Sequence, residues 1–129
     1  MSKINSTLKI FFQISNLILI IFYIYPGSIM GFFLYGSFDL QPTITADFFN
    51  ISSNHFYAFT FLSFIAILAY HTHRYLNFII MYLFLLSIIL ELLHLIISER
   101  SFQISDLLGN ILGVFLILTI YKIWRRIKF

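Results

Sequence analysis

Residues 76–97 read LNFIIMYLFLLSIILELLHLII, and this stretch decides the fold. A helix rises about 1.5 Å per residue, so the stretch is long enough to cross the roughly 30 Å hydrocarbon core of a bilayer. Its only charged residue is Glu91, and His94 follows about one turn later. The stretch therefore indicates a membrane-spanning helix rather than an element of a soluble domain.

The composition of the whole chain supports the same class of protein. The 129 residues are 60% hydrophobic and 10% charged, whereas soluble domains are about 45–50% apolar and about 25% charged. Such hydrophobicity also excludes an intrinsically disordered chain, and the absence of cysteine excludes a disulfide scaffold. We therefore expect one integral membrane domain covering residues 1–129.

Further apolar segments extend this prediction to an all-α bundle of four transmembrane helices. The expected spans are residues 9–28, 51–70, 76–97 and 106–124. The segment between the first two spans carries the helix breakers Gly27, Gly31, Gly36 and Pro42. Its apolar residues 29–35 are too few to cross a bilayer. We therefore expect residues 27–50 to form an extracytoplasmic loop with an interfacial or re-entrant piece.

The basic residues predict the orientation of the bundle. If the chain crosses four times, seven of its eight Lys and Arg side chains fall on the side of the termini, and only Arg100 falls on the other. The positive-inside rule then places both termini in the cytoplasm. The basic and aromatic tail after residue 120 is typical of a helix end anchored to anionic lipid. We therefore expect membrane lipids, and no nucleic acid, as partners.

Ionisable residues at membrane depth are informative, because each costs about 2.5–3.5 kcal/mol at a helix centre. Glu91 and His94 are three residues apart and share one helix face. On the last span, Asp106, Asn110 and Gly113 stand at i, i+4 and i+7 and also share a face. Because the connector between these two spans is short, we expect antiparallel neighbours, with Gly113 allowing another helix to approach closely.

Two further polar residues fall at the same depth. His55 lies at the outer end of the second span, and Arg100 lies in the connector between the last two. We expect polar residues from three helices to meet in the outer half of the membrane: His55, Glu91, His94, Arg100, Asp106 and Asn110. The residues alone leave two interpretations open, an outward-facing ligand site and a structural network.

The spacing of these residues resembles that of the VanZ-like family. The family pattern runs Glu-x-x-Gln, then Arg, Asp, Asn and Gly, and the matching positions here are Glu91-Leu-Leu-His94, Arg100, Asp106, Asn110 and Gly113. The element His55-Phe56-Tyr57-Ala58-Phe59 is similar to the family's His-Phe-x-x-Phe/Tyr. The resemblance covers roughly residues 54–113 and implies a four-helix membrane bundle.

The resemblance also implies a location, and the chain departs from the pattern at a few positions. The family is named for a glycopeptide-resistance protein, which implies the cell envelope and a bacterial-type inner (plasma) membrane. His94 stands where the family usually has Gln, and Ile117 stands where a second glycine is expected. Ile51 and Ser52 replace an Asp-Lys pair, which removes an ion pair from the outer mouth.

These residues lead to a first functional hypothesis, an outward-facing pocket for a polar or phosphate-bearing lipid headgroup, an envelope precursor or another anionic small ligand. Arg100 would hold the anionic group, and Asp106 and Asn110 would position it. The candidates for acid–base catalysis are Glu91, His94 and His55. The chain has no Ser or Cys nucleophile motif and no glycine-rich phosphate loop, so the sequence does not decide whether it is an enzyme.

The remaining hypotheses concern metals and a structural role. A metal site from His55, Glu91, His94 and Asp106 is chemically reasonable, but their spacing is not a known zinc signature. The sequence therefore predicts no metal and no other cofactor. The alternative function is a non-enzymatic accessory or scaffold protein, working with a membrane-protein partner, in which the polar residues only lock the bundle and Gly113 is structural.

Overall fold

The computed structural model describes residues 3–128, with side chains from residue 5 onward, and all regular elements in this part of the chain are helices. In chain order these are α1 (Lys3–Ile24), α2 (Ile29–Tyr35), α3 (Ser53–Tyr70), α4 (Leu76–Leu93) and α5 (Ile104–Ile127). All except α2 are long and apolar enough to cross a membrane. The prediction of an all-α bundle with four membrane-spanning helices is therefore confirmed.

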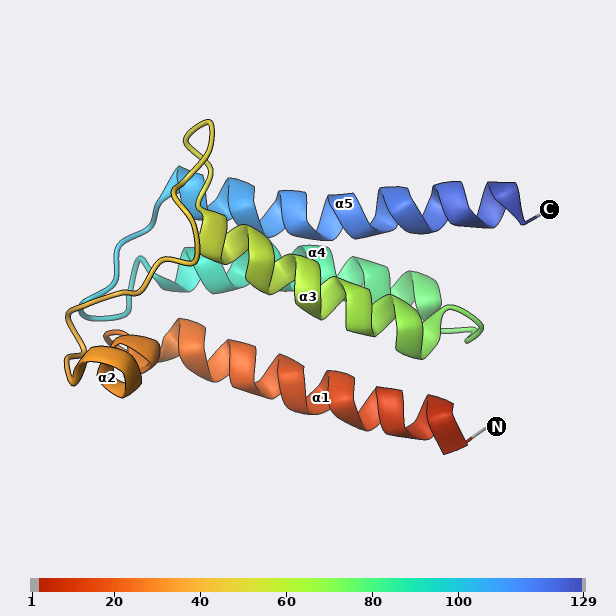
Figure 1. Ribbon diagram of the computed structural model, residues 1–129, viewed down its shortest axis with the longest axis horizontal. Coiled ribbons are helices and arrows are strands. Elements are labelled where there is room, and N and C mark those ends of the chain that lie inside the picture. The colour runs from red at the N-terminus through yellow and green to blue at the C-terminus, as the bar shows by residue number, and fades with distance from the viewer. Residues whose placement is uncertain (1–2, 129) are drawn as a thin grey trace.

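The four long helices run side by side, and α3 contacts the other three (Figure 1). The start of α1 and the end of α5 lie at one end of the bundle, and α2 lies with the long loops at the other end. We call the latter the loop end. An even number of crossings gives this arrangement. That the other end faces the cytoplasm stays a prediction.

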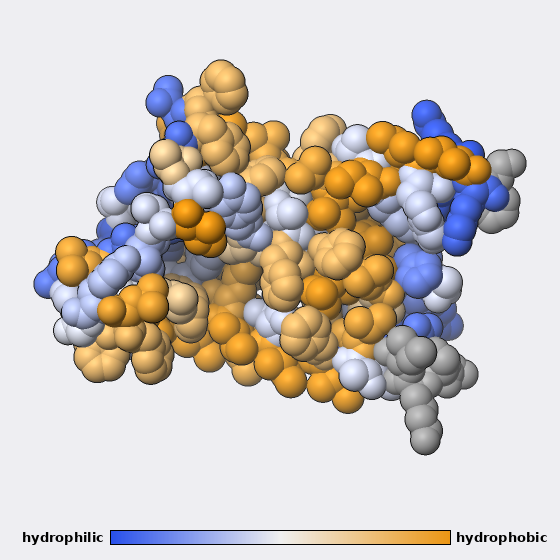
Figure 2. All heavy atoms as spheres, in the orientation of Figure 1, coloured by the Kyte–Doolittle hydropathy of each residue, from blue (hydrophilic) through white to orange (hydrophobic). Residues whose placement is uncertain are grey.

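The surface around the bundle is apolar. Large side chains such as Ile10, Phe61, Phe78 and Phe115 are exposed, and Figure 2 shows a hydrophobic band between two more hydrophilic ends. Soluble monomers rarely expose so much contiguous apolar surface. In a bilayer the same side chains contact lipid tails at no cost in hydration.

Helices α3 and α5 pack closely through two glycines. A Cβ added to Gly113 would lie 2.7 Å from the carbonyl oxygen of Phe56, and one added to Gly109 would lie 2.7 Å from that of Ser52. The close approach predicted at Gly113 is confirmed. Gly109 was not predicted, although Gly109 and Gly113 have the G-x-x-x-G spacing that favours close helix pairs in membranes.

The segment before α3 is a compact loop built on α2. The Ser28 hydroxyl accepts a hydrogen bond from the Gly31 amide at the start of α2, and Gly36 ends the helix with a φ of 70°. The α2 backbone at Gly31 packs so tightly against the carbonyl of Leu40 that no side chain fits there. A helix of 7 residues does not span a bilayer, as expected; that this piece is interfacial or re-entrant and lies outside the cytoplasm stays a prediction.

Two predicted spans end earlier than expected. Helix α1 ends at Ile24 rather than at residue 28, because Pro26 and Gly27 follow and Gly27 has a φ of 102°. Helix α4 ends at Leu93 rather than at residue 97. The amides of His94, Leu95 and Ile96 bind carbonyls three residues back, in turns tighter than an α-helix.

Candidate functional site

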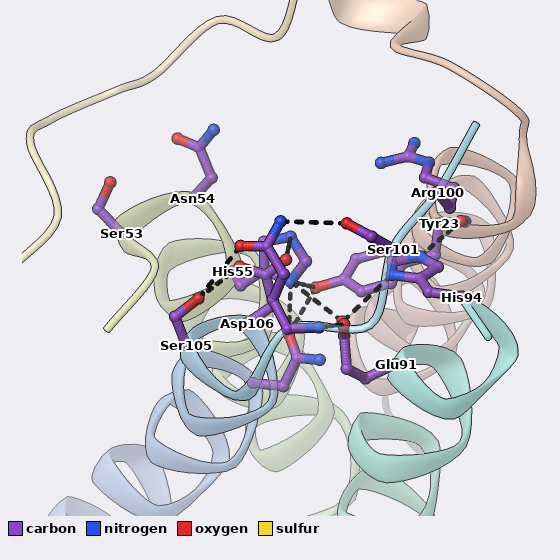
Figure 3. A network of polar contacts seen from close by, with 12 residues as sticks. Tyr23, Ser53, Asn54, His55, Glu91, His94, Arg100, Ser101, Ser105 and Asp106 are labelled. Atoms are coloured by element: carbon purple, nitrogen blue, oxygen red, sulfur yellow. Dashed lines mark hydrogen bonds and ion pairs between the residues drawn. The ribbon is translucent and has the colours of Figure 1, made fainter. Parts of the chain in front are cut away.

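Five of the six predicted polar residues meet at the loop end of the bundle. Nε2 of His55 lies 3.5 Å from Oδ2 of Asp106, and its Nδ1 lies 3.9 Å from Oε2 of Glu91. Nδ1 of His94 lies 3.3 Å from the same Glu91 oxygen. Figure 3 shows His55 of α3 between the carboxylates of α5 and α4, with His94 beyond Glu91.

Tyr23 of α1 stands at the centre of this cluster, although nothing in the sequence singled it out. Its hydroxyl donates a hydrogen bond to Oδ1 of Asn110 at 2.5 Å and lies 2.9 Å from Nδ1 of His55. Since the one hydroxyl proton is used toward Asn110, the hydroxyl accepts from His55. Nδ1 of His55 therefore carries a proton, and in a neutral ring the free lone pair is on Nε2, facing Asp106.

The protonation of His94 follows in the same way. Its Nε2 lies 3.0 Å from the backbone carbonyl oxygen of Tyr23, which can only accept a hydrogen bond. Nε2 therefore carries the proton. In a neutral ring the lone pair is on Nδ1, and it faces Oε2 of Glu91. The His94 ring also stacks on the Tyr23 ring, with 5.8 Å between their centroids.

Glu91 is fully buried, and only one of its carboxylate oxygens has a hydrogen bond. Oε1 accepts from the backbone amide of Gln103 at 2.9 Å, whereas Oε2 has no hydrogen-bond partner among the described residues. The carboxylate also lies in the last turn of α4, where the helix dipole disfavours negative charge. Asp106 lies in the first turn of α5, where the dipole favours it.

Arg100 lies in the connector between α4 and α5, but its guanidinium does not join the polar cluster as predicted. Its guanidinium donates to the carbonyl oxygens of Phe22 at 2.9 Å, Tyr25 at 3.2 Å and Gly27 at 2.7 Å, and so caps the end of α1. Within residues 3–128 it forms no ion pair with a carboxylate, and Figure 3 shows it apart from both acids. The carbonyl oxygens at the end of α1 have no partner within the helix, and they attract the guanidinium away from the polar cluster. Its position in the connector does not reveal this. Burial lowers the pKa of the guanidinium, an effect that nearby negative groups oppose.

Asn110 is buried, and both the oxygen and the nitrogen of its side-chain amide form hydrogen bonds inside the bundle. Oδ1 accepts from Tyr23 and lies 3.2 Å from Nδ1 of His55, and Nδ2 donates to the carbonyl oxygen of Ser87 at 3.1 Å. These bonds join α5 to α1, α3 and α4. Ser52, where the family pattern has a lysine, is also buried, and its amide donates to the Ser105 carbonyl oxygen at 3.1 Å.

A cavity of about 390 Å³ opens beside this cluster. Its polar lining includes Tyr23, Asn54, His55, His94 and Arg100, and its apolar lining comes mainly from α2. Figure 2 shows the surface hollowed beneath the loop that follows α2. Glu91 and Asp106 are not among its lining residues and lie behind His55.

Asn54 holds the loop that closes one side of the cavity. Its Nδ2 donates to the carbonyl oxygen of Pro42 at 2.7 Å, and its Oδ1 accepts from the amide of Ile44 at 3.0 Å. Nearby, Asp47 accepts from the amide of Ser53 at 2.9 Å and so caps the start of α3. These two polar residues position a loop wall rather than the floor of the cavity.

Comparison with known proteins identifies one family. The family model described as VanZ/LLP1 matches residues 3–125, well beyond the residues on which the resemblance was first noted. No curated protein and no solved structure matches the chain.

Proposed function

The chain belongs to the VanZ-like family, and on that premise we propose that it is a multi-pass protein of the cell envelope that binds a polar or phosphate-bearing lipid headgroup or envelope precursor beside α2. The observation that carries this proposal is the divided lining of the cavity. One wall is apolar and the other carries Arg100, His94 and His55. An amphiphile matches such a cavity, with its chain on the first wall and its headgroup on the second.

Arg100 is the residue best suited to an anionic headgroup. It lines the cavity, and its hydrogen bonds to α1 use Nε and Nη2 only. The two N–H groups of Nη1 have no hydrogen-bond partner among the described residues and are available to a phosphate or carboxylate. The guanidinium is fixed by its bonds to α1, so it binds an anion without first being ordered.

The location of the site follows from the predicted orientation. With both termini in the cytoplasm of a bacterial-type inner membrane, the loop end faces outward. The cavity then lies at the level of the outer lipid headgroups, where lipid-linked envelope precursors are also present. A connection with glycopeptide resistance belongs to the same proposal.

A scaffold role is the second candidate, and one observation favours it. Tyr23 and Asn110 are buried and joined by a hydrogen bond, and Asn110 also donates to the backbone carbonyl oxygen of Ser87, so these groups are engaged inside the bundle. Buried hydrogen bonds of this kind hold membrane helices together. For Asn110 we therefore favour locking of the bundle over the predicted contact with substrate.

Lipid retention tests the proposal. Ala58 lines the cavity from α3, and Ala58→Trp fills it; Phe61→Trp, on the lipid-exposed side of the same helix, is the matched control. The full chain is purified in mild detergent, and co-purifying lipids are identified by mass spectrometry. We expect wild type and Phe61→Trp to retain the same anionic lipid class and Ala58→Trp to retain at least fivefold less, with equal melting temperatures. Equal retention in all three proteins, or none in the wild type, would refute lipid binding and leave the scaffold role.

A further inference from the structure

Two carboxylates at the loop end, the buried Glu91 and the partly buried Asp106, form no ion pair with a Lys or Arg among the described residues. Asp106 and Glu91 each lie within 4 Å of His55, and Glu91 is fully enclosed. The fixed charge nearest in the chain, Arg100, bonds to the end of α1 and forms no ion pair with either acid. A buried carboxylate without a partner is costly, because its charge is removed from water.

The hydrogen bonds of the network leave electron pairs facing one another. Nδ1–H of His55 donates a hydrogen bond to the Tyr23 hydroxyl, so in a neutral ring the lone pair of Nε2 faces Oδ2 of Asp106 across 3.5 Å. Oε2 of Glu91 is buried and has no hydrogen-bond partner among the described residues, and one carboxylate oxygen of Glu91 lies within 4.8 Å of a ligand atom of His55 and of Asp106. Three electron-pair donors with no proton between them form the environment of a cation.

We propose that His55, Glu91 and Asp106 bind a divalent transition-metal cation of the Zn²⁺ or Mn²⁺ class. One donor atom from each residue lies within 4.8 Å of the other two. Bonds of about 2.0–2.2 Å place tetrahedral ligands about 3.3–3.5 Å apart. The His55–Asp106 pair already has this spacing at 3.5 Å, so mainly the Glu91 side chain must move inward.

The kind of ligand and its surroundings suit such an ion. One imidazole and two carboxylates favour Zn²⁺ or Mn²⁺ over soft cations that prefer thiolate. The second nitrogen of His55 donates to the Tyr23 hydroxyl, and the second oxygen of Glu91 accepts from the Gln103 amide. Both bonds orient the ligands as the outer partners of metal sites do. Two carboxylates and one divalent cation also cancel in charge at the site.

Three protein ligands leave at least one coordination position open. His55 lines the cavity and the two carboxylates lie behind it, so the ion and a headgroup in the cavity occupy separate sites. The metal site itself depends only on the three side chains and is tested apart from lipid.

Metal content of the purified full chain tests the proposal. The protein in detergent is stripped with a chelator and reloaded separately with Zn²⁺ and Mn²⁺, and bound metal is measured by inductively coupled plasma mass spectrometry. Glu91→Gln and Asp106→Asn keep side-chain shape and remove charge; Glu99→Gln, an exposed acid in the nearby connector, is the matched control. We expect about one ion per chain in wild type and Glu99→Gln, and at least tenfold weaker binding in the other two variants.

Two further results decide the case. A stripped wild-type protein that takes up neither metal overturns the proposal, whether or not the variants fold, and leaves protons as the groups that neutralise these donors. The cavity variant Ala58→Trp is expected to lose lipid and keep its metal. If that variant loses its metal together with the lipid, the ion is held by the lipid, and this result also overturns the metal site. If the wild type binds metal but no lipid, only the proposed function is overturned.

Discussion

The packing of Gly109 against α3 leads to a prediction with a magnitude. Gly109→Ala places a Cβ 2.7 Å from the Ser52 carbonyl oxygen, where ordinary contact begins at 3.4 Å, so the two helices must separate by about 0.7 Å. Overpacking costs about 1–3 kcal/mol, and the better helix propensity of alanine returns up to about 1 kcal/mol. The contacted Ser52 oxygen belongs to the backbone and cannot rotate away. We therefore expect the free energy of unfolding to fall by about 1–2 kcal/mol, a change of about 5–30-fold in the unfolding equilibrium.

The same change reaches the site. The added Cβ would also lie 3.1 Å from the Cβ of His55, so moving α3 outward lengthens the His55–Asp106 distance from 3.5 Å. Gly113→Ala is the matched control, because it meets Phe56 and Thr60 one turn deeper.

Thermal unfolding in detergent, followed by size-exclusion chromatography, measures the loss of stability in both variants, and metal content measures the geometry of the site. A Gly109→Ala protein as stable as wild type refutes the close packing of α3 on α5. If Gly113→Ala loses as much metal as Gly109→Ala, the link between this contact and the site is wrong.

Three further substitutions test individual contacts. Tyr23→Phe removes the hydroxyl shared by His55 and Asn110, and we expect a loss of about 1 kcal/mol in bicelle unfolding experiments; no loss would contradict the hydrogen bonds assigned to it. Arg100→Gln removes the cap of α1, so hydrogen–deuterium exchange is expected to rise over residues 22–28 and to stay unchanged in α3; uniform exchange would argue against the cap. His94→Gln keeps a donor for the Tyr23 carbonyl oxygen and is expected to melt within a few degrees of wild type, whereas His94→Leu loses about 1–3 kcal/mol; equal melting of the two would show that His94 is not a polar partner.

The spans were predictable because hydropathy and charge reflect the physics of a bilayer directly. A carboxylate inside an apolar run must face other helices, so the meeting of Glu91 with His55 and Asp106 also followed from the sequence. The end of α4 did not follow, because residues 94–97 are apolar whether they are helical or not. In the structure the amides of residues 94–96 bind carbonyls three residues back, and hydropathy carries no signal for this change to tighter turns.

Two errors concerning the site have a common cause. Tyr23 is one aromatic residue in an apolar run, and its role appears only when α1 is placed against α3 and α5. Arg100 has a long side chain whose direction is not fixed by its position in the connector. The backbone carbonyls at the end of α1 decide that direction, and backbone groups leave no signal in the sequence.

The network around Tyr23 has a consequence for how the protein is made. Tyr23 belongs to the first span and Asn110 to the last, 87 residues apart, so their hydrogen bond forms only after the ribosome has delivered the final helix to the membrane. Until then Glu91 is in the bilayer with the two earlier spans, and Asp106 is not yet present to add a second negative charge. A chain truncated before α5 therefore lacks both the Tyr23–Asn110 hydrogen bond and the pair of Glu91 and Asp106. The site is complete only in a molecule whose four long helices are all inserted.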